Sequence, residues 1–176
     1  RRQRQVERDR RLALLVDRTG TLWVGSERQG VARRGASGFE RLSEVGGRSL
    51  GGVATLVEGP SGTIWAGTAS ELVRLGPGDL QQRWGAADGL PRGPVWAVLD
   101  EPDGPVWIGT AGGLARLDGD RVENVAVPGH PDLAVRALLR SRVDRTLWLG
   151  TVSGLFGLAE DGSLRRPAIV DGGGQT

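Results

Sequence analysis

The chain of 176 residues contains no cysteine, methionine, tyrosine or lysine, and its one histidine is His130. The absence of cysteine excludes disulfide bonds and thiolate metal sites. A single histidine supplies neither the several ligands that metal sites use nor, without a partner motif, a serine–histidine–aspartate triad. No apolar run approaches the roughly 18 residues that a membrane-spanning helix needs. We therefore expect no metal site, no cofactor, no catalytic residues and no membrane span in this segment.

Positive charge is present but is not concentrated in one place. All 23 basic residues are arginine, and the net charge is only +2. Because nothing titrates between neutral pH and the guanidinium range, the sequence pI of about 10.7 says little about partners. Six arginines and two acidic residues fall within residues 1–11, which we interpret as a basic tail or the remnant of a preceding linker. The other arginines form no phosphate-binding stripe, so we expect no nucleic-acid partner.

The sequence is rich in glycine and carries a repeated motif centred on tryptophan. Its 30 glycines are typical of an all-β protein with short strands and many tight turns. The four copies of the motif read LWVGS, IWAGT, VWIGT and LWLGT, and begin at Leu22, Ile64, Val106 and Leu147. Their tryptophans lie 42, 42 and 41 residues apart. Such a fixed period indicates a repeat protein whose units bury their apolar faces against one another.

A single repeat predicts four short strands. In the third copy, apolar or alternating runs cover residues 95–100, 105–110, 114–118 and 121–127, with Gly, Pro and Asp between them. The second run of every copy is apolar on both of its alternating faces, so both faces need to be covered. Stacked sheets provide that cover, and four-stranded sheets repeated radially are the blades of a β-propeller.

We therefore predict an all-β protein with four consecutive four-stranded antiparallel blades. The repeats occupy residues 12–170, and the blades cover about 12–45, 53–85, 95–128 and 134–169. Residues 171–176 are interpreted as a Gly-rich linker. The four blades are expected to form a partial propeller, an open arc, and a closed four-bladed ring is kept as the alternative. An arc leaves unpaired blade faces at both ends, which favours association.

The motif tryptophans, and the glycines two residues after them, have a structural interpretation. Each indole buries roughly 150–250 Å², and we expect it to lie as a wedge between blades. The glycine lies on the same face of the strand, where it leaves room for the neighbouring blade. The predicted inter-blade residues are Trp23, Trp65, Trp107, Trp148, Gly25, Gly67, Gly109 and Gly150.

The third copy carries the fullest match to a known repeat. An apolar strand, an acid and a Gly turn precede a Trp-Xaa-Gly-Thr strand and a Gly-Leu-Xaa-Arg-Leu strand, which resembles the two-component regulator propeller repeat. The matching residues are Gly104, Trp107, Gly109, Thr110, Gly112, Gly113, Leu114, Arg116 and Leu117. The second copy departs from the pattern at Glu71, and the fourth copy departs at Arg145 and Gly157. The resemblance covers residues 12 to about 166.

The resemblance implies a sensor region in the extracytoplasmic, periplasmic portion of a bacterial receptor. Such regions precede a transmembrane helix and a histidine kinase or diguanylate cyclase. Their propellers usually have about seven blades, so other propeller blades of the parent chain are expected partners. The function expected of this segment is non-enzymatic ligand binding. A protein-interaction scaffold without a small ligand, and a propeller lyase or lactonase, remain as alternatives.

A ligand site, where the ligand is an unknown small molecule or protein, is expected on loops held by the rigid scaffold. By analogy with other propellers, the turns between second and third strands share one face with the connections between blades. The candidate ligand-binding residues are Arg28, Glu71, Trp84, Asp88, Arg92, Trp96 and His130. Core packing is the alternative for the two tryptophans, and an exposed loop position is the alternative for the histidine.

Overall fold

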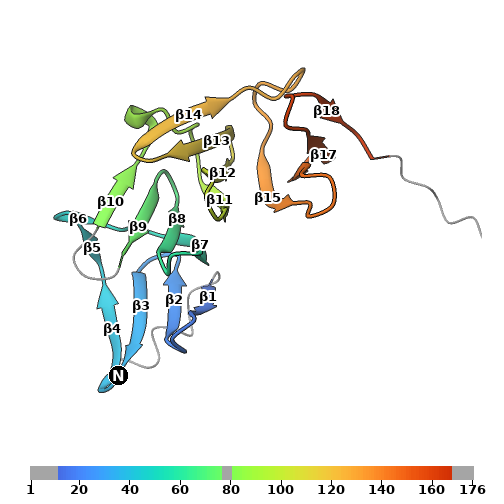
Figure 1. The fold of residues 1–176 in the computed structure, drawn as a ribbon. Coiled ribbons are helices and arrows are strands. Elements are labelled where there is room, and N and C mark those ends of the chain that lie inside the picture. Colours follow the sequence, from blue (N-terminus) through green and yellow to red (C-terminus); the bar gives the residue numbers. More distant parts are fainter. Residues whose placement is uncertain (1–11, 77–80, 168–176) are drawn as a thin grey trace, which may run out of the picture.

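The computed structural model describes residues 12–76 and 81–167. It contains four antiparallel four-stranded sheets in chain order, here called blades 1 to 4, and one two-stranded ribbon (Figure 1). The fold is therefore the predicted all-β propeller arrangement. The predicted tail at residues 1–11 and the predicted linker at 171–176 lie outside the described residues. Within the described ranges, no helix is long and apolar enough to cross a membrane.

The strands of each blade follow the chain from one edge of the sheet to the other. Blade 1 contains β1 (Leu12–Val16), β2 (Leu22–Ser26), β3 (Gly30–Gly35) and β4 (Gly38–Leu42). Blade 2 contains β7 (Val53–Glu58), β8 (Ile64–Thr68), β9 (Leu72–Leu75) and β10 (Gln81–Trp84). Blade 3 contains β11 (Val95–Asp100), β12 (Val106–Thr110), β13 (Gly113–Asp118) and β14 (Arg121–Val125). Blade 4 contains β15 (Val135–Arg140), β16 (Leu147–Thr151), β17 (Gly154–Leu158) and β18 (Leu164–Arg165).

Two short elements were not predicted from the sequence. The ribbon of β5 (Glu44–Val45) and β6 (Arg48–Ser49) lies in the connection between blades 1 and 2. A 3₁₀ helix at Ala86–Asp88 lies in the connection between blades 2 and 3. Both connections lead from the outermost strand of one blade to the innermost strand of the next, so their structure sets the spacing of the blades.

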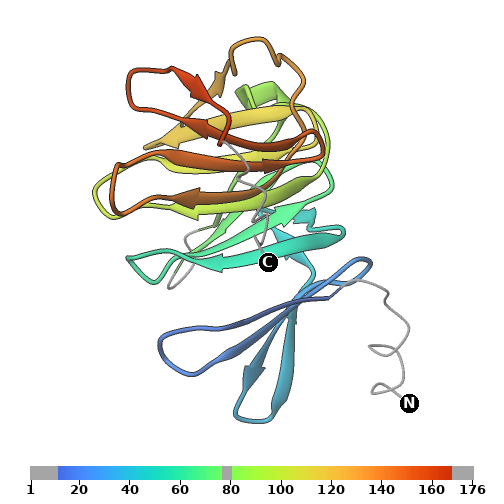
Figure 2. The same cartoon turned by 90° about the vertical axis from the view of Figure 1, so that its right-hand side faces the viewer.

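The blades stack in sequence as an open arc. The first strands β1, β7, β11 and β15 each contact the next in that order. Figures 1 and 2 show blade 1 and blade 4 at opposite ends of the row, with the first strands toward the concave side. Among the described residues, the extensive contacts join successive blades only. The arrangement is thus a partial propeller.

Within the described residues, the hydrophobic core consists of three clusters, and each cluster joins two successive blades. Trp23 of blade 1 packs with Leu56 and Ile64 of blade 2 in the first cluster. In the second, Trp65 of blade 2 packs with residues of blade 3 such as Ile108. The third cluster joins blades 3 and 4 in the same way. Since apolar burial is the main favourable term in folding, each blade depends on its neighbours for stability.

Candidate functional site

Because neighbouring strands run in opposite directions, the turns and connections of the blades lie on two opposite faces of the arc. The turn face carries the turns between the first and second strands of each blade, such as 17–21 and 101–105. The linker face carries the turns between second and third strands together with the connections between blades. On the linker face the two kinds of segment meet, because the Ala111 N–H donates a hydrogen bond to the Pro94 carbonyl at 3.1 Å. The predicted ligand residues lie in or next to these segments, and Trp84 ends the outermost strand of blade 2.

Glu71, on the linker face, takes part in a network of ion pairs. Its carboxylate pairs with Arg48 at 3.0 Å and with Arg83 at closer range. Arg83 also donates to the carbonyls of Val45, Arg48 and Ser49, at distances of 2.9 to 3.2 Å. Glu71 and Arg83 thereby fasten the β5–β6 ribbon to blade 2. This network accounts for a Glu at a position where glycine is expected, without invoking a ligand.

Trp84 lies in the core. Its side chain is 4% exposed, its ring centroid is 5.9 Å from that of Trp65, and its indole N–H donates to the Asp120 carbonyl at 3.2 Å. Because the ring is buried to this extent, neither of its faces is free to contact a ligand. Trp84 is therefore a core residue, which is the alternative stated for it in the sequence analysis.

Trp96 forms part of a row along the innermost strands. The pairing of first and second strands is shifted between Val53/Thr55, Val95/Ala97 and Val135/Ala137. Each shift leaves one residue outside the ladder as a bulge, and these residues are Ala54, Trp96 and Arg136. The Arg136 guanidinium lies over the Trp96 ring, 4.2 Å from its centroid. Arg136 was missed from the sequence, although it stands one repeat after Trp96 in the same position.

The remaining linker-face candidates lie apart from this pair. Arg28 and Arg92 are exposed. Asp88 accepts a hydrogen bond from the Gly85 N–H at 2.8 Å and so stabilises its own turn. His130 packs against Phe156 with ring centroids 4.7 Å apart. The structure therefore brings Trp96 together with Arg136, a residue that was not predicted.

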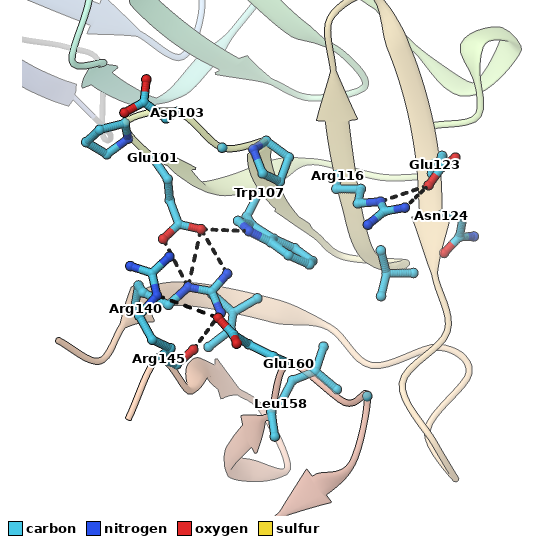
Figure 3. A pocket seen from close by; sticks show the side chains of 17 residues that line it. Glu101, Asp103, Trp107, Arg116, Glu123, Asn124, Arg140, Arg145, Leu158 and Glu160 are labelled. Carbon is cyan, nitrogen blue, oxygen red and sulfur yellow. Dashed lines mark hydrogen bonds and ion pairs between the residues drawn. The ribbon is translucent and has the colours of Figure 1, made fainter. Parts of the chain in front are cut away.

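A cleft of about 610 Å³ opens on the turn face between blades 3 and 4 (Figure 3). Its walls carry paired charges. Arg116 bonds Glu123 within blade 3 at 2.6 Å, and Arg145 lies 3.6 Å from Glu160 within blade 4. None of the ligand-binding residues predicted from the sequence lies in this cleft.

Between these walls, one carboxylate joins an indole to an arginine of the next blade. Glu101 accepts from Trp107 Nε1 at 3.0 Å and from Arg140 Nη2 at 2.8 Å (Figure 3). Hydrogen bonding and charge from Arg140 hold the pKa of Glu101 below its ordinary value of 4.5, against the opposing effect of burial. A carboxylate kept ionised in this way is suited to holding blades together rather than to donating protons.

A hydrogen bond from the motif indole to a carboxylate also occurs at the other two interfaces between blades, but with different partners. Trp23 Nε1 donates to Asp17 of its own blade at 2.8 Å. Trp65 Nε1 donates instead to Asp100 of the following blade at 2.7 Å. In blade 2 the position just after the first strand is Gly59, where a Cβ would lie 1.8 Å from the Asp100 carboxylate. Glycine at this position therefore makes room for the carboxylate of the next blade.

Asp17 provides a prediction about pH. Hydrogen bonds from the Thr19 hydroxyl and the Trp23 indole lower the pKa of Asp17 from 3.8 to about 2. A lowered pKa in the folded state contributes stability above the unfolded-state pKa, and this contribution is lost as the pH falls from about 4 to about 2. Urea unfolding across this range should therefore show a steeper loss of stability for the native chain than for Asp17→Asn. The exposed Asp118→Asn serves as a control that keeps the native slope, and equal slopes for all three chains would contradict the assignment.

The described residues include no group of three or more His, Cys, Asp or Glu side chains placed to hold a metal ion. On the turn face, Asp17, Glu58, Asp100, Glu101 and Asp144 are bonded to an indole, an arginine or a turn N–H. The arrangement has the features of a scaffold whose blades are joined by hydrogen bonds and ion pairs. In its row of bulge residues, Ala54 and Arg136 are exposed and Trp96 is half-buried.

Comparison with known proteins identifies structural relatives only. No protein-family model and no curated protein matches the sequence. The extracellular domain assigned to a hybrid two-component system of B. thetaiotaomicron matches 88% of this chain with a TM-score of 0.72 and 20% identity. A catalytically inactive His-to-Ala variant of virginiamycin B lyase from Staphylococcus aureus matches 88% with a TM-score of 0.67 and 15% identity. A gluconolactonase from Xanthomonas campestris matches 86% with a TM-score of 0.63 and 18% identity.

These likenesses establish the propeller fold. The chain spans 23% of the two-component extracellular domain, 54% of the lyase and 59% of the gluconolactonase. Receptor domains and enzymes share the fold, so the choice between their functions depends on the residues of this chain.

Proposed function

We propose that this chain is a ligand-sensing propeller segment of a bacterial extracytoplasmic receptor, and that it binds its ligand without converting it. The proposal is supported by two similarities that point to the same class of protein, one in sequence and one in fold. The repeat resembles the two-component regulator propeller repeat, and the fold matches the extracellular domain of a hybrid two-component system. Periplasmic location, a kinase or cyclase output and other blades of the parent chain belong to the same proposal.

The ligand site is proposed at the row of bulge residues on the concave side of the arc. Trp96 is half-buried and Arg136 is exposed. The Arg136 guanidinium forms no ion pair with any residue that the structure describes, and it is held against the indole. An arginine stacked on tryptophan offers a cation and a flat ring edge to one ligand. The positive charge of Arg136 favours a ligand with an anionic group.

The enzyme alternative has less support from the residues. A His-to-Ala variant of the lyase is catalytically inactive, whereas His130 of this chain packs against Phe156. Three carboxylates that line the cleft, Glu101, Glu123 and Glu160, are paired with arginine. These observations favour binding over catalysis.

The test is a thermal-shift screen of the chain with a panel of carboxylated, phosphorylated and neutral sugars and amino acids. Binding to the folded state raises Tm, by an amount that grows with ligand concentration. We expect a rise with an anionic compound that is lost in Trp96→Ala and in Arg136→Ala but kept in Arg121→Ala, an exposed residue of the outermost strand β14. A compound whose Tm rise survives both substitutions would refute the site. An unchanged response of the parent receptor after deletion of this segment would refute the function.

A further inference from the structure

One position of the outermost strand differs in size from blade to blade. In blade 2 it is Trp84, which pairs with Leu72 of β9, and in blade 3 it is Val125, which pairs with Leu114 of β13. Leu72 and Leu114 each stand opposite the motif glycine of their blade, so Trp84 and Val125 are equivalent positions. Blade 1 has Leu42 there, packed against the first core cluster. An indole therefore faces blade 3, whereas a much smaller side chain faces blade 4.

Trp84 fills the space between blades 2 and 3. It is buried in the second core cluster, and its ring centroid is 5.9 Å from that of the motif residue Trp65. The Arg74 guanidinium lies over the Trp84 ring, 5.7 Å from its centroid. The Trp84 N–H donates to the carbonyl of Asp120, in the hairpin between β13 and β14 of the next blade, at 3.2 Å. This interface shows how two blades hold an indole between them.

The cleft between blades 3 and 4 is lined by the equivalent groups. Val125, Trp107 and Arg116 lie in its wall on the blade 3 side. Trp107 and Arg116 pair across the strands, as the motif tryptophan and the arginine of blade 2 do. On the blade 4 side the hairpin between β17 and β18 contributes Glu160 to the wall (Figure 3). The groups that hold Trp84 thus recur around a space that holds no indole.

The arginine of each blade is held by an equivalent partner. Arg74 bonds to Gln82, which pairs with it from the outermost strand. Arg116 bonds at 2.6 Å to Glu123, which pairs with it in the same way. A guanidinium positioned on the sheet in this manner offers its flat face to a ring beside it. Arg116 is therefore placed to contact a ring in the cleft as Arg74 contacts Trp84.

The smaller side chain at position 125 leaves its neighbours uncovered. Trp65 is buried and Arg74 is half-buried, whereas Trp107 is half-buried and Arg116 is exposed. The cleft that results has a volume of about 610 Å³. Small-molecule sites have volumes of about 300–1,000 Å³, so the cleft is large enough for an aromatic molecule.

We propose that the cleft between blades 3 and 4 binds a planar aromatic small molecule with an N–H donor, in the place that Trp84 fills at the preceding interface. The ring lies beside Trp107 and against Arg116, and the N–H points to the hairpin of blade 4. Ring stacking and cation–π attraction favour such a ligand. The site shares no residue with the row of bulge residues, so it does not depend on the proposed function.

The test is a titration of the ¹⁵N-labelled full chain with unlabelled indole, followed in the nuclear magnetic resonance signals of the tryptophan N–H groups. We expect the Trp107 signal to shift and saturate, and the Trp96 signal to stay in place. N-methylindole has the same ring without the donor. It should bind about two- to tenfold more weakly, the effect of one neutral hydrogen bond.

Val125→Trp places the side chain of Trp84 in the cleft. This variant should lose the indole-dependent shift of Trp107, and its Tm should rise because the added ring covers apolar surface. Val143→Trp is the matched control, since it makes the same change at a side chain that is 97% exposed. The control should bind indole as the native chain does and should have the native Tm.

Arg116→Ala tests the cleft without adding a side chain to it. Loss of a cation–π contact of about 0.5–1 kcal/mol should weaken indole binding about two- to fivefold. The proposal is overturned if indole shifts no tryptophan signal or only that of Trp96. It is equally overturned if Val125→Trp or Arg116→Ala binds indole as tightly as the native chain. Equal affinities for indole and N-methylindole would contradict the N–H donor.

Discussion

Replacement of Trp65 by alanine is expected to lower the free energy of unfolding by about 3–5 kcal/mol, the usual range for a buried tryptophan. Its side chain is 4% exposed and packs at the interface of blades 2 and 3. The substitution also leaves the Asp100 carboxylate without its indole donor. Because whole domains have only about 5–15 kcal/mol of stability, this one change removes a large share of it. Urea unfolding monitored by circular dichroism measures the loss.

The matched control is Trp96→Ala. This indole is half-buried, and its described partner is the Arg136 guanidinium. A cation–π contact at an exposed site contributes about 0.5–1 kcal/mol, and the half-buried ring covers less apolar area than that of Trp65. The control should therefore lose clearly less stability than Trp65→Ala. Equal losses for the two variants would show that the repeated tryptophan does not hold the blades together.

The substitution Gly109→Ala is expected to destabilise the chain by about 1–3 kcal/mol, the cost of inserting atoms into a packed site. The new Cβ would lie 2.8 Å from Val135 Cγ1 and 2.9 Å from the Val135 carbonyl oxygen. The carbonyl belongs to the first strand of blade 4 and has no rotamer by which to move away. Blade 4 must therefore shift outward, which opens the third core cluster.

Gly150→Ala is the control for Gly109→Ala, since it makes the same change at the same position of a blade with no described successor. Its Cβ would meet only the Ala137 side chain closely, at 3.1 Å. We expect the Gly109 variant to unfold at a lower urea concentration than the Gly150 variant. The reverse order would contradict the stacking of blade 4 on blade 3.

Much of the fold follows from the sequence, because hydrophobic period and turn residues are local properties. The run predicted at residues 95–100 coincides with β11, and the run at 121–127 contains β14. The ribbon of β5 and β6 was missed, although Gly46 and Gly47 between its strands are a recognised hairpin signal. Its strands have two residues each, which is too short for alternation to be visible.

The hydrogen bonds and ion pairs that join the blades could not be predicted in the same way. Asp17 does cap its turn, as acids near turns are expected to do, but it also binds Trp23. Whether an indole bonds to an acid of its own blade or of the next depends on how far one sheet is offset from its neighbour. That offset is a tertiary property. The bond between Arg140 and Glu101 spans 39 residues of chain, and no local pattern specifies it.

The ligand candidates show the same limit. Trp84 and Trp96 both lie outside the repeated tryptophan position, yet Trp84 lies in the core and Trp96 is half-buried on an innermost strand. The difference comes from a bulge at the start of β11, which turns Trp96 out of the ladder. Bulges depend on how a strand meets its neighbours, so the partnership of Trp96 with Arg136 became visible only in three dimensions.

Hydrogen exchange of the indole N–H groups, followed by nuclear magnetic resonance, tests most directly whether carboxylates fasten tryptophans between the blades. The account predicts that Trp23, Trp65 and Trp107 exchange far more slowly than Trp96, because their N–H groups donate to carboxylates at 2.7 to 3.0 Å. Exchange of all four at the rate of a solvent-exposed indole would contradict it.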